Sequence, residues 1–163
     1  MDPERIRKIR LMDLELQALY AKLFEDRFFQ KIAVSQNAEL KELNKNQPLV
    51  IMIIGMVKEI MPSTIGMYVG MNRSSLSRMI DSLEEKGFVW KNKDPKDRRK
   101  VLVSLTEKGE KCYEFLNRIV EEMTVEIIGS GEEKDFRDFE KSLETILRVL
   151  RKIDSTSKSG KSV

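Results

Sequence analysis

The sequence predicts a mainly α-helical fold that contains one small β-hairpin (α+β). Long segments at both ends of the 163-residue chain repeat apolar residues at helical spacing among charged ones. Between these segments, two short helical patterns meet at a glycine and are followed by two stretches of β character. Helix, tight turn, helix and hairpin in this order predict a winged helix-turn-helix lobe, flanked by long helices at the N- and C-termini.

The N-terminal part of the chain is expected to be helical and to lead into a buried helix. Apolar residues recur at imperfect helical spacing over residues 4–30, and residues 35–46 are polar enough for a connection or a short helix. Residues 47–58 carry a nearly continuous apolar run. We expect a buried helix there rather than a strand, because the run is long and Pro48 stands where a first helical turn favours proline.

A helix-turn-helix is predicted over residues 62–86. Pro62 starts a short helix that we expect to end at Gly70, because glycine is favoured just past helix C-termini. Asn72 then serves as the N-cap of a second helix, and Gly87 follows its end. One face of the second helix holds apolar residues at i, i+3, i+4 and i+7, which predicts that this face is buried. These residues are Leu76, Met79, Ile80 and Leu83.

Two strands joined by a charged turn are predicted to follow. Residues 88–90 begin the first strand, and residues 101–105 alternate in character and form the second. Thr106 is the predicted N-cap of the next helix. We therefore expect a β-hairpin, the wing, directly after the helix-turn-helix.

Two long helices are predicted to complete the chain. The first begins after Thr106 and is broken at residues 129–131, which contain two glycines. The second covers residues 132–153, where apolar residues are spaced 3, 4, 3, 4 and 3 apart. A seam this narrow is typical of helix-on-helix packing, within the chain or with a second chain. Its members are Phe136, Phe139, Leu143, Ile146, Leu150 and Ile153. Residues 154–163 are polar and are expected to form a flexible tail.

The residue types that the chain lacks exclude several classes of function. It has no histidine, which is the usual general base and the commonest metal ligand. It also shows no glycine-rich phosphate loop and no nucleophile–base pairing. We therefore expect no enzymatic activity, no metal and no cofactor. The single cysteine, Cys112, excludes an intramolecular disulfide, and its core-type position in a predicted helix favours a structural role.

The chain is expected to be cytoplasmic and not to enter a membrane. No apolar run approaches the roughly 20 residues that a bilayer span requires. The N-terminus is charged from residue 2 onward and lacks the apolar core of a signal peptide.

Positive charge is concentrated in the predicted wing. Residues 91–100 contain six basic and two acidic residues, which gives them a net charge of +4. The whole chain nets only +3, so the rest of it nets −1. A basic feature on a nearly neutral body suits a polyanionic partner. An ordinary solvated loop is the alternative.

The second helix of the predicted helix-turn-helix has the polarity that contact with a phosphate-lined groove requires. Its first half contains arginines and serines, and its acids begin only at Asp81. Donors near a helix N-terminus, together with the positive end of the helix dipole, attract phosphates. We predict base or phosphate contacts by Ser74, Ser75, Ser77 and Arg78. Arg73 and the wing lysines, including Lys96, are predicted phosphate contacts, which position rather than specify.

Three features of the sequence resemble the MarR (multiple antibiotic resistance regulator) family of winged-helix transcription factors. Residues 65–89 read IGMYVGMNRSSLSRMIDSLEEKGFV and look like that family's helix-turn-helix and the entry to its wing. Residues 94–109 read DPKDRRKVLVSLTEKG and match the family's wing pattern. The matched positions are Asp97, Arg99, Leu105, Thr106 and Gly109. The third feature is the order of long helices around the winged helix.

The resemblance implies a homodimer that binds double-stranded DNA. Residues 1–153 would form one domain, in which residues 4–30 and 107–153 dimerise and residues 47–106 form the DNA-binding lobe. The second helix of the motif would enter the major groove of a pseudo-palindromic operator. Arg99 would reach into the minor groove and Asp97 would orient it, as the family's wing residues do. Many members also bind a small anionic or phenolic ligand in a cleft between the dimerisation helices and the lobe.

Two functions from different classes remain open on this reading. The first is a dimeric, sequence-specific transcription regulator that acts as a ligand-responsive repressor. In it, Arg98 contacts a phosphate or is solvated. The second is a winged-helix module that binds another protein without specific DNA binding. The basic wing tip favours the first, because a protein-interaction module does not need one.

Overall fold

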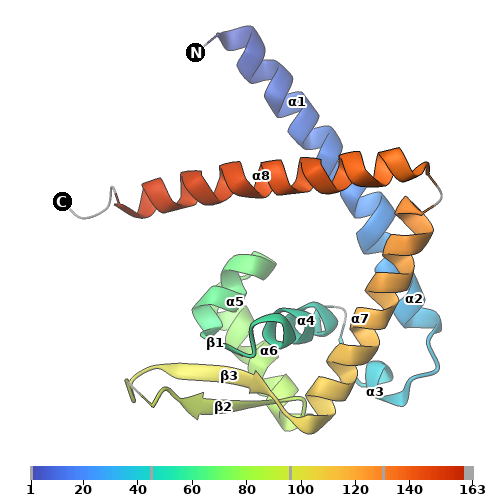
Figure 1. The fold of residues 1–163 in the computed structure, drawn as a ribbon. Helices are drawn as coiled ribbons and strands as arrows, with labels where there is room; N and C mark the ends of the chain where they lie inside the picture. The colour runs from blue at the N-terminus through green and yellow to red at the C-terminus, as the bar shows by residue number, and fades with distance from the viewer. Residues whose placement is uncertain (1, 45, 96, 130, 160–163) are drawn as a thin grey trace. The chain divides into compact units, whose positions relative to one another are not determined.

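A computed structural model describes residues 2–44, 46–95, 97–129 and 131–159 of the chain. It confirms a mostly helical protein with a small antiparallel sheet. The chain divides into two compact units, residues 1–121 and residues 122–163. Figure 1 shows the order of its elements along the chain. In the described part of the chain, no helix combines the length and apolar character that a bilayer span needs.

The N-terminal helices of the first unit follow one another with little interruption. Helix α1 (Pro3–Tyr20) continues through a π-helical turn, η1 (Ala21–Glu25), into α2 (Asp26–Val34), and a short α3 (Ala38–Lys41) follows. The predicted helix over residues 4–30 is thus confirmed, although it reaches Val34. Helix α1 has no buried residue in this chain.

The helices of the winged lobe begin where the sequence predicts. Helix α4 (Gln47–Val57) and helix α5 (Pro62–Val69) each carry proline in the first turn, and α6 (Arg73–Glu85) follows. Gly70 has φ 62°, the left-handed conformation that lets the chain leave α5 without a Cβ clash. Asn72 caps α6, because its Oδ1 accepts from the Ser75 backbone N–H at 2.9 Å.

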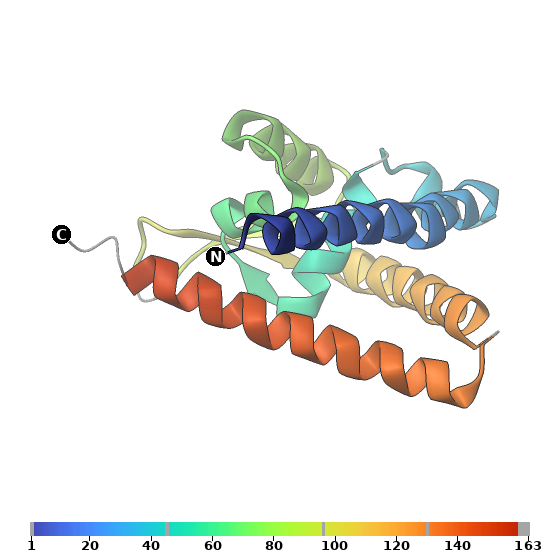
Figure 2. The ribbon, with the colours of Figure 1, turned by 90° about the horizontal axis from the view of Figure 1, so that it is seen from above.

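The sheet has one more strand than the sequence predicts. Strands β2 (Val89–Lys93) and β3 (Val101–Leu105) form the predicted antiparallel hairpin. A two-residue strand, β1 (Glu59–Ile60), pairs with the other edge of β3, which gives the order β1-β3-β2. Strand β1 is too short to show alternation, and the chain enters it through Lys58 at φ 69° rather than through a glycine. Figures 1 and 2 both show the hairpin extending past the ends of α5 and α6.

The last two helices are confirmed, and the second of them is longer than expected at its C-terminal end. Helix α7 (Glu107–Ile128) ends before the predicted break, and α8 (Glu133–Ser159) continues beyond residue 153. The prediction of a flexible tail from residue 154 therefore does not describe residues 154–159, which are helical, while residues 160–163 lie outside the described residues. Extending an existing helix costs far less than starting one, since each added residue gains a hydrogen bond.

The core of the first unit is formed by α4, α5, α6 and the sheet. Three of the four predicted core residues of α6 are buried, and Met79 is half-buried. The buried residues of these elements include Val50, Ile51, Ile54, Ile65, Leu76, Ile80, Leu83, Phe88 and Val103. Each such side chain contributes about 1.5–3 kcal/mol when it leaves water. This core fixes α6 against the base of the wing.

A buried polar network joins the start of α4 to the end of α6. The side chain of Gln47 is 1% exposed. Its Nε2 donates to Ser82 Oγ at 3.2 Å, and its Oε1 accepts from Lys86 Nζ at 2.8 Å and from the Asn44 backbone N–H at 2.8 Å. Every polar atom of this amide is thereby occupied, which removes the penalty for burying it. Ser82 and Lys86 are far from Gln47 in the sequence, so no local pattern indicates these contacts.

Helix α7 closely approaches the backbone just before β2 at Gly109. A Cβ at position 109 would collide with the carbonyl oxygen of Phe88, which already accepts from the Thr106 backbone N–H at 3.0 Å. We expect Gly109→Ala to lower the free energy of unfolding by about 1–3 kcal/mol, because the collision involves backbone that cannot rotate away. Thermal unfolding followed by circular dichroism measures the loss.

Gly66→Ala in α5 is the matched control. Its added methyl would lie 3.3 Å from Leu76 Cδ2, the end of a flexible side chain. Alanine also favours a helix over glycine by about 1 kcal/mol. The close approach at Gly109 would be refuted by equal melting temperatures for the two variants.

Candidate nucleic-acid interface

The predicted contact residues of α6 lie in its first two turns. Arg73, Ser74, Ser77 and Arg78 are exposed, and Ser75 is half-buried. The serines differ in their local bonds, because the Ser74 hydroxyl donates to Asn72 Oδ1 at 2.8 Å and so belongs to the helix cap. Arg73 and Ser77 are four residues apart and therefore share one side of the helix.

The start of α6 is electropositive. Its first turn contains no acidic residue, and Arg73 is its first residue. The unpaired backbone N–H groups at a helix N-terminus carry a partial positive charge, to which an arginine there adds. This end of α6 is therefore suited to an anionic ligand.

The wing tip shows the predicted contact between an aspartate and an arginine. Arg99 Nε donates to Asp97 Oδ1 at 3.3 Å, and the Arg99 backbone N–H donates to the same oxygen at 3.2 Å. The Arg99 side chain remains 93% exposed, so the aspartate orients it without burying it. Arg98 is exposed as well, and Lys96 lies outside the described residues.

Backbone bonds form the turn that carries this pair. The Lys100 backbone N–H donates to the Asp97 carbonyl at 2.8 Å, and the Asp94 backbone N–H donates to the Lys100 carbonyl at 3.0 Å. Lys100 Nζ also lies 3.9 Å from Asp97 Oδ2. The aspartates therefore have separate roles, since Asp94 closes the turn and Asp97 faces two basic side chains.

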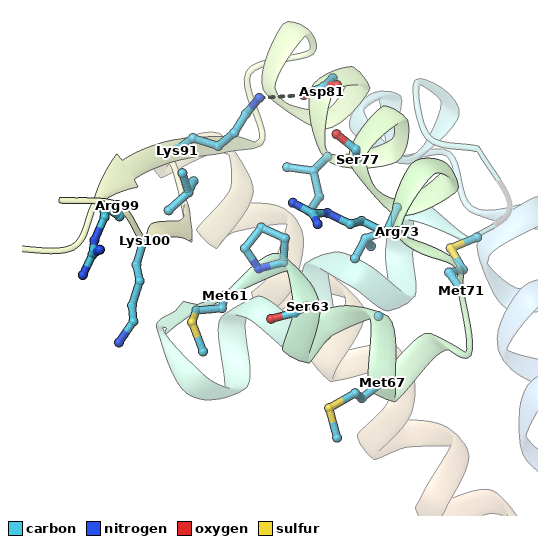
Figure 3. Close-up of a pocket in the computed structure, with 15 residues that line it drawn as sticks. Met61, Ser63, Met67, Met71, Arg73, Ser77, Asp81, Lys91, Arg99 and Lys100 are labelled. Carbon is cyan, nitrogen blue, oxygen red and sulfur yellow. Dashed lines mark hydrogen bonds and ion pairs between the residues drawn. The ribbon is translucent and has the colours of Figure 1, made fainter. Parts of the chain in front are cut away.

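A cleft of about 750 Å³ lies between α5, α6 and the wing (Figure 3). It brings together three of the predicted contact residues, Arg73 and Ser77 from α6 and Arg99 from the wing. Ser74, Ser75, Arg78, Asp97 and Arg98 do not line it. Its apolar side is formed by Met61, Met67, Met71, Leu76, Ile80 and Val101.

Sequence reasoning missed the partners of Lys91, which it counted only as part of the wing's charge. Lys91 Nζ lies 2.6 Å from Asp81 Oδ1 and 2.7 Å from Glu84 Oε2. The hydrogen bond to Asp81, followed by the one to Glu84, raises the pKa of Lys91. Two acids three residues apart on α6 and a lysine two residues after the buried Val89 of β2 are the signal that could have indicated this contact.

A metal-binding cluster and a reactive cysteine are the other chemical sites that the first unit could hold. Within the described residues, no three of the acidic and cysteine side chains are grouped so as to hold a metal ion. Cys112 is fully buried in α7. Burial raises the pKa of its thiol to about 12, and the carboxylate of Glu39 acts in the same direction. A thiol held in this form is a poor nucleophile.

The fold and this surface define a winged helix-turn-helix protein with a basic wing. A model of the MarR family matches residues 43–101. The transcriptional repressor MprA of Escherichia coli strain K12 is 30% identical over 94 residues, which are 55% of this chain and 52% of MprA. The chain thus spans about half the length of the curated relatives it matches. These matches confirm the resemblance to the MarR family.

Solved structures share the fold at lower identity. FabT of Streptococcus pneumoniae, solved in complex with DNA, has a TM-score of 0.67 and 19% identity, covering 89% of this chain and 99% of FabT. Wild-type MarR of Escherichia coli in its apo form has a TM-score of 0.61 and 24% identity, covering 85% of this chain and 94% of MarR. The MarR winged-helix fold therefore extends over most of the chain.

The burial of Cys112 predicts a protected thiol. In the native protein at pH 8, we expect a thiol reagent such as DTNB to react at least about 100-fold more slowly than in denaturant, because reaction requires the core to open. The absorbance of the released thiolate gives both rates. A native rate close to the denatured one would show that Cys112 is accessible and would contradict its structural role in the core.

Proposed function

We propose that this protein is a dimeric, sequence-specific DNA-binding transcription regulator that acts as a repressor. The observation that carries the proposal is the cleft, where Arg73 and Ser77 of α6 and Arg99 of the wing meet. Two separate elements thus present cations and a hydroxyl toward one space. An arrangement of this kind suits a duplex, whose groove and backbone can contact both elements at once.

In this proposal α6 enters the major groove. The electropositive start of the helix faces the phosphates, and Arg73 contacts one of them. Arg78 and Ser77 are both exposed. We assign them to base edges, where the long side chain of arginine commonly pairs with guanine and serine can form a hydrogen bond. Ser74 and Ser75 are closer to the helix cap, so we assign them to the phosphate backbone.

The wing is proposed to lie along the minor groove. Arg99 is nearly fully exposed at the tip and is oriented by Asp97. A narrow minor groove has an enhanced negative potential that attracts arginine. Arg98 and Lys96 are assigned to neighbouring phosphates, where they add affinity but no sequence preference.

Uncovered apolar helix faces support a homodimer. Helix α1 exposes Ile6, Ile9, Leu11, Met12, Leu14, Leu16 and Leu19. In the second unit, α8 exposes most of its predicted seam, including Phe136, Leu143, Ile146, Leu150 and Ile153. Apolar surface of this extent on helices is typical of an interface. A second copy of the chain would cover both faces and set two winged lobes on a pseudo-palindromic operator.

Repression and ligand response are supported by similarity rather than by a site. MprA, which this chain resembles over half its length, is described as a transcriptional repressor. The family resemblance extends the proposal to a small anionic or phenolic effector, without a metal or cofactor. A regulator of this kind acts where the chromosome is, so we propose a cytoplasmic location.

A winged-helix module that binds another protein is the alternative function. It is favoured by the exposed apolar residues of α4 and α5, since Met56 and Met67 are each 73% exposed and Tyr68 is 65% exposed. Retention on heparin separates the two functions. A DNA-binding wing gives retention that falls when the wing-tip arginine is replaced, whereas a protein-binding patch gives retention that does not depend on it.

The proposal predicts that Arg99 contributes to DNA binding and not to folding. We expect Arg99→Ala to lower affinity for duplex DNA about 10- to 100-fold, since a dimer loses two cations. The melting temperature and the dimer should stay unchanged, because the side chain is exposed. Fluorescence anisotropy of a labelled duplex measures the affinity at several salt concentrations.

Lys41→Ala in α3 is the charge-matched control, since it removes one exposed cation outside the lobe and outside the proposed dimerisation helices. The parent protein should lose about 10³–10⁵ in affinity between 50 and 200 mM salt. Wild-type affinity in Arg99→Ala would place the wing away from the DNA. A complex that is insensitive to salt would overturn DNA binding as a whole.

The apolar seam of α8 predicts how the dimer can be broken. Leu143→Asp places a charge in the seam, so we expect a monomer with no measurable binding to a full palindrome. Thr145→Asp adds the same charge two residues away, off the seam, and should remain dimeric. Light scattering gives the mass of each variant. A Leu143→Asp monomer that still binds the full palindrome tightly would contradict the dimeric mechanism.

A further inference from the structure

Lys91 is a wing lysine that is directed at α6 rather than at the wing tip. It lies in the middle of β2, opposite Val103 of β3. Because side chains alternate along a strand, it shares a face with the buried Val89, and this part of β2 packs against α6. Figure 3 shows its side chain extended toward Asp81.

Three polar contacts join this one residue to α6. Nζ of Lys91 lies 2.6 Å from Asp81 Oδ1 and 2.7 Å from Glu84 Oε2, and its backbone N–H donates to Glu84 Oε1 at 3.2 Å. Asp81 and Glu84 are three residues apart, so their carboxylates lie on the same side of the helix. We call these three residues the Lys91 cluster.

The Lys91 cluster lies at the edge of the proposed DNA contact surface. Lys91 and Asp81 line the same cleft as Arg73 and Arg99. Without Lys91, α6 would present two uncompensated carboxylates beside the place where phosphates approach. Like charges there would repel the duplex, most strongly at low salt.

The side chain of Lys91 is less exposed than those of the two wing-tip cations in the cleft, Arg99 and Lys100. Its side chain is 30% exposed, whereas that of Arg99 is 93% exposed and that of Lys100 is 54% exposed. The hydrogen bond to Asp81, followed by the one to Glu84, raises the pKa of Lys91, so both contacts favour its ammonium form. A lysine with two carboxylates already in contact has little to gain from a phosphate.

We propose that Lys91 is a positioning residue for DNA binding, which acts through Asp81 and Glu84 and not through a phosphate. It fixes the base of the wing on α6 and neutralises two carboxylates at the edge of the cleft. This inference rests on the proposed function and corrects the expectation that every wing lysine contacts phosphate.

The test compares the loss of duplex affinity that Lys91→Met causes in two backgrounds. One is the parent chain, and the other is the double variant Asp81→Asn, Glu84→Gln. Duplex affinity is measured by fluorescence anisotropy across a salt series. In the parent we expect about a tenfold loss of duplex affinity at low salt, which shrinks as salt rises because salt screens the repulsion by the two carboxylates. In the double variant we expect the loss to shrink to less than about threefold, because the carboxylates are gone. Lys91→Arg, which keeps the charge and the donors, should bind within about threefold of the parent.

Trp90 supplies a readout that needs no DNA. It is the chain's one tryptophan, and it lies beside Lys91 in β2. We expect its fluorescence anisotropy to fall in Lys91→Met and to be retained in Lys91→Arg, because the base of the wing is released only in the first. Should Lys91→Met fail to fold, Lys91→Gln is measured in the same two backgrounds.

An equal loss in both backgrounds would overturn the inference, and a salt slope lowered by the same amount in both would make Lys91 a phosphate contact. Unchanged Trp90 anisotropy in the folded variant would also overturn it. Failure of the proposed function would give a different result, because the parent protein would then bind no duplex at all.

Discussion

The wing depends on the junction between its two strands and the start of α7. The Thr106 hydroxyl donates to the Gly87 carbonyl at 2.6 Å and accepts from the Gly109 backbone N–H at 3.0 Å. The Thr106 backbone N–H donates to the Phe88 carbonyl at 3.0 Å. One threonine thus caps α7 and closes the hairpin at the end of α6. The junction therefore fixes the orientation of the rest of the hairpin.

Pairing decides which charges of the lobe are available to a ligand. Asp81 and Glu84 are held by Lys91, and Asp97 is held by Arg99 and Lys100. The negative charge of these acids is therefore already compensated, so the positive charge of the cations at the cleft is the greater. These exposed pairs add little to folding stability. These pairs instead determine the electrostatic potential on the face that contains the cleft, and this potential governs how a polyanion approaches.

Local signals made much of the fold and part of the site predictable. Gly70 and Asn72 have backbone roles that few residue types can fill, so the helix-turn-helix follows from them. The contact between Asp97 and Arg99 was predictable because the partners are only two positions apart in the sequence and a known wing pattern includes both. The partners of Gln47 and Lys91 were not predictable, because these contacts depend on how distant segments pack. Strand β1 carries too few residues to form a pattern, and the end of α8 depends on helix extension rather than on apolar residues.

The central claim is that two winged lobes bind a specific duplex. Selection of bound duplexes from a random pool tests it most directly, because the enriched sequences report both specificity and symmetry. The account predicts enrichment of a pseudo-palindrome whose half-sites are centred about one helical turn apart, roughly 10 base pairs, or a multiple of it. A pool that shows no enrichment, at a salt concentration where the protein binds DNA, would contradict it.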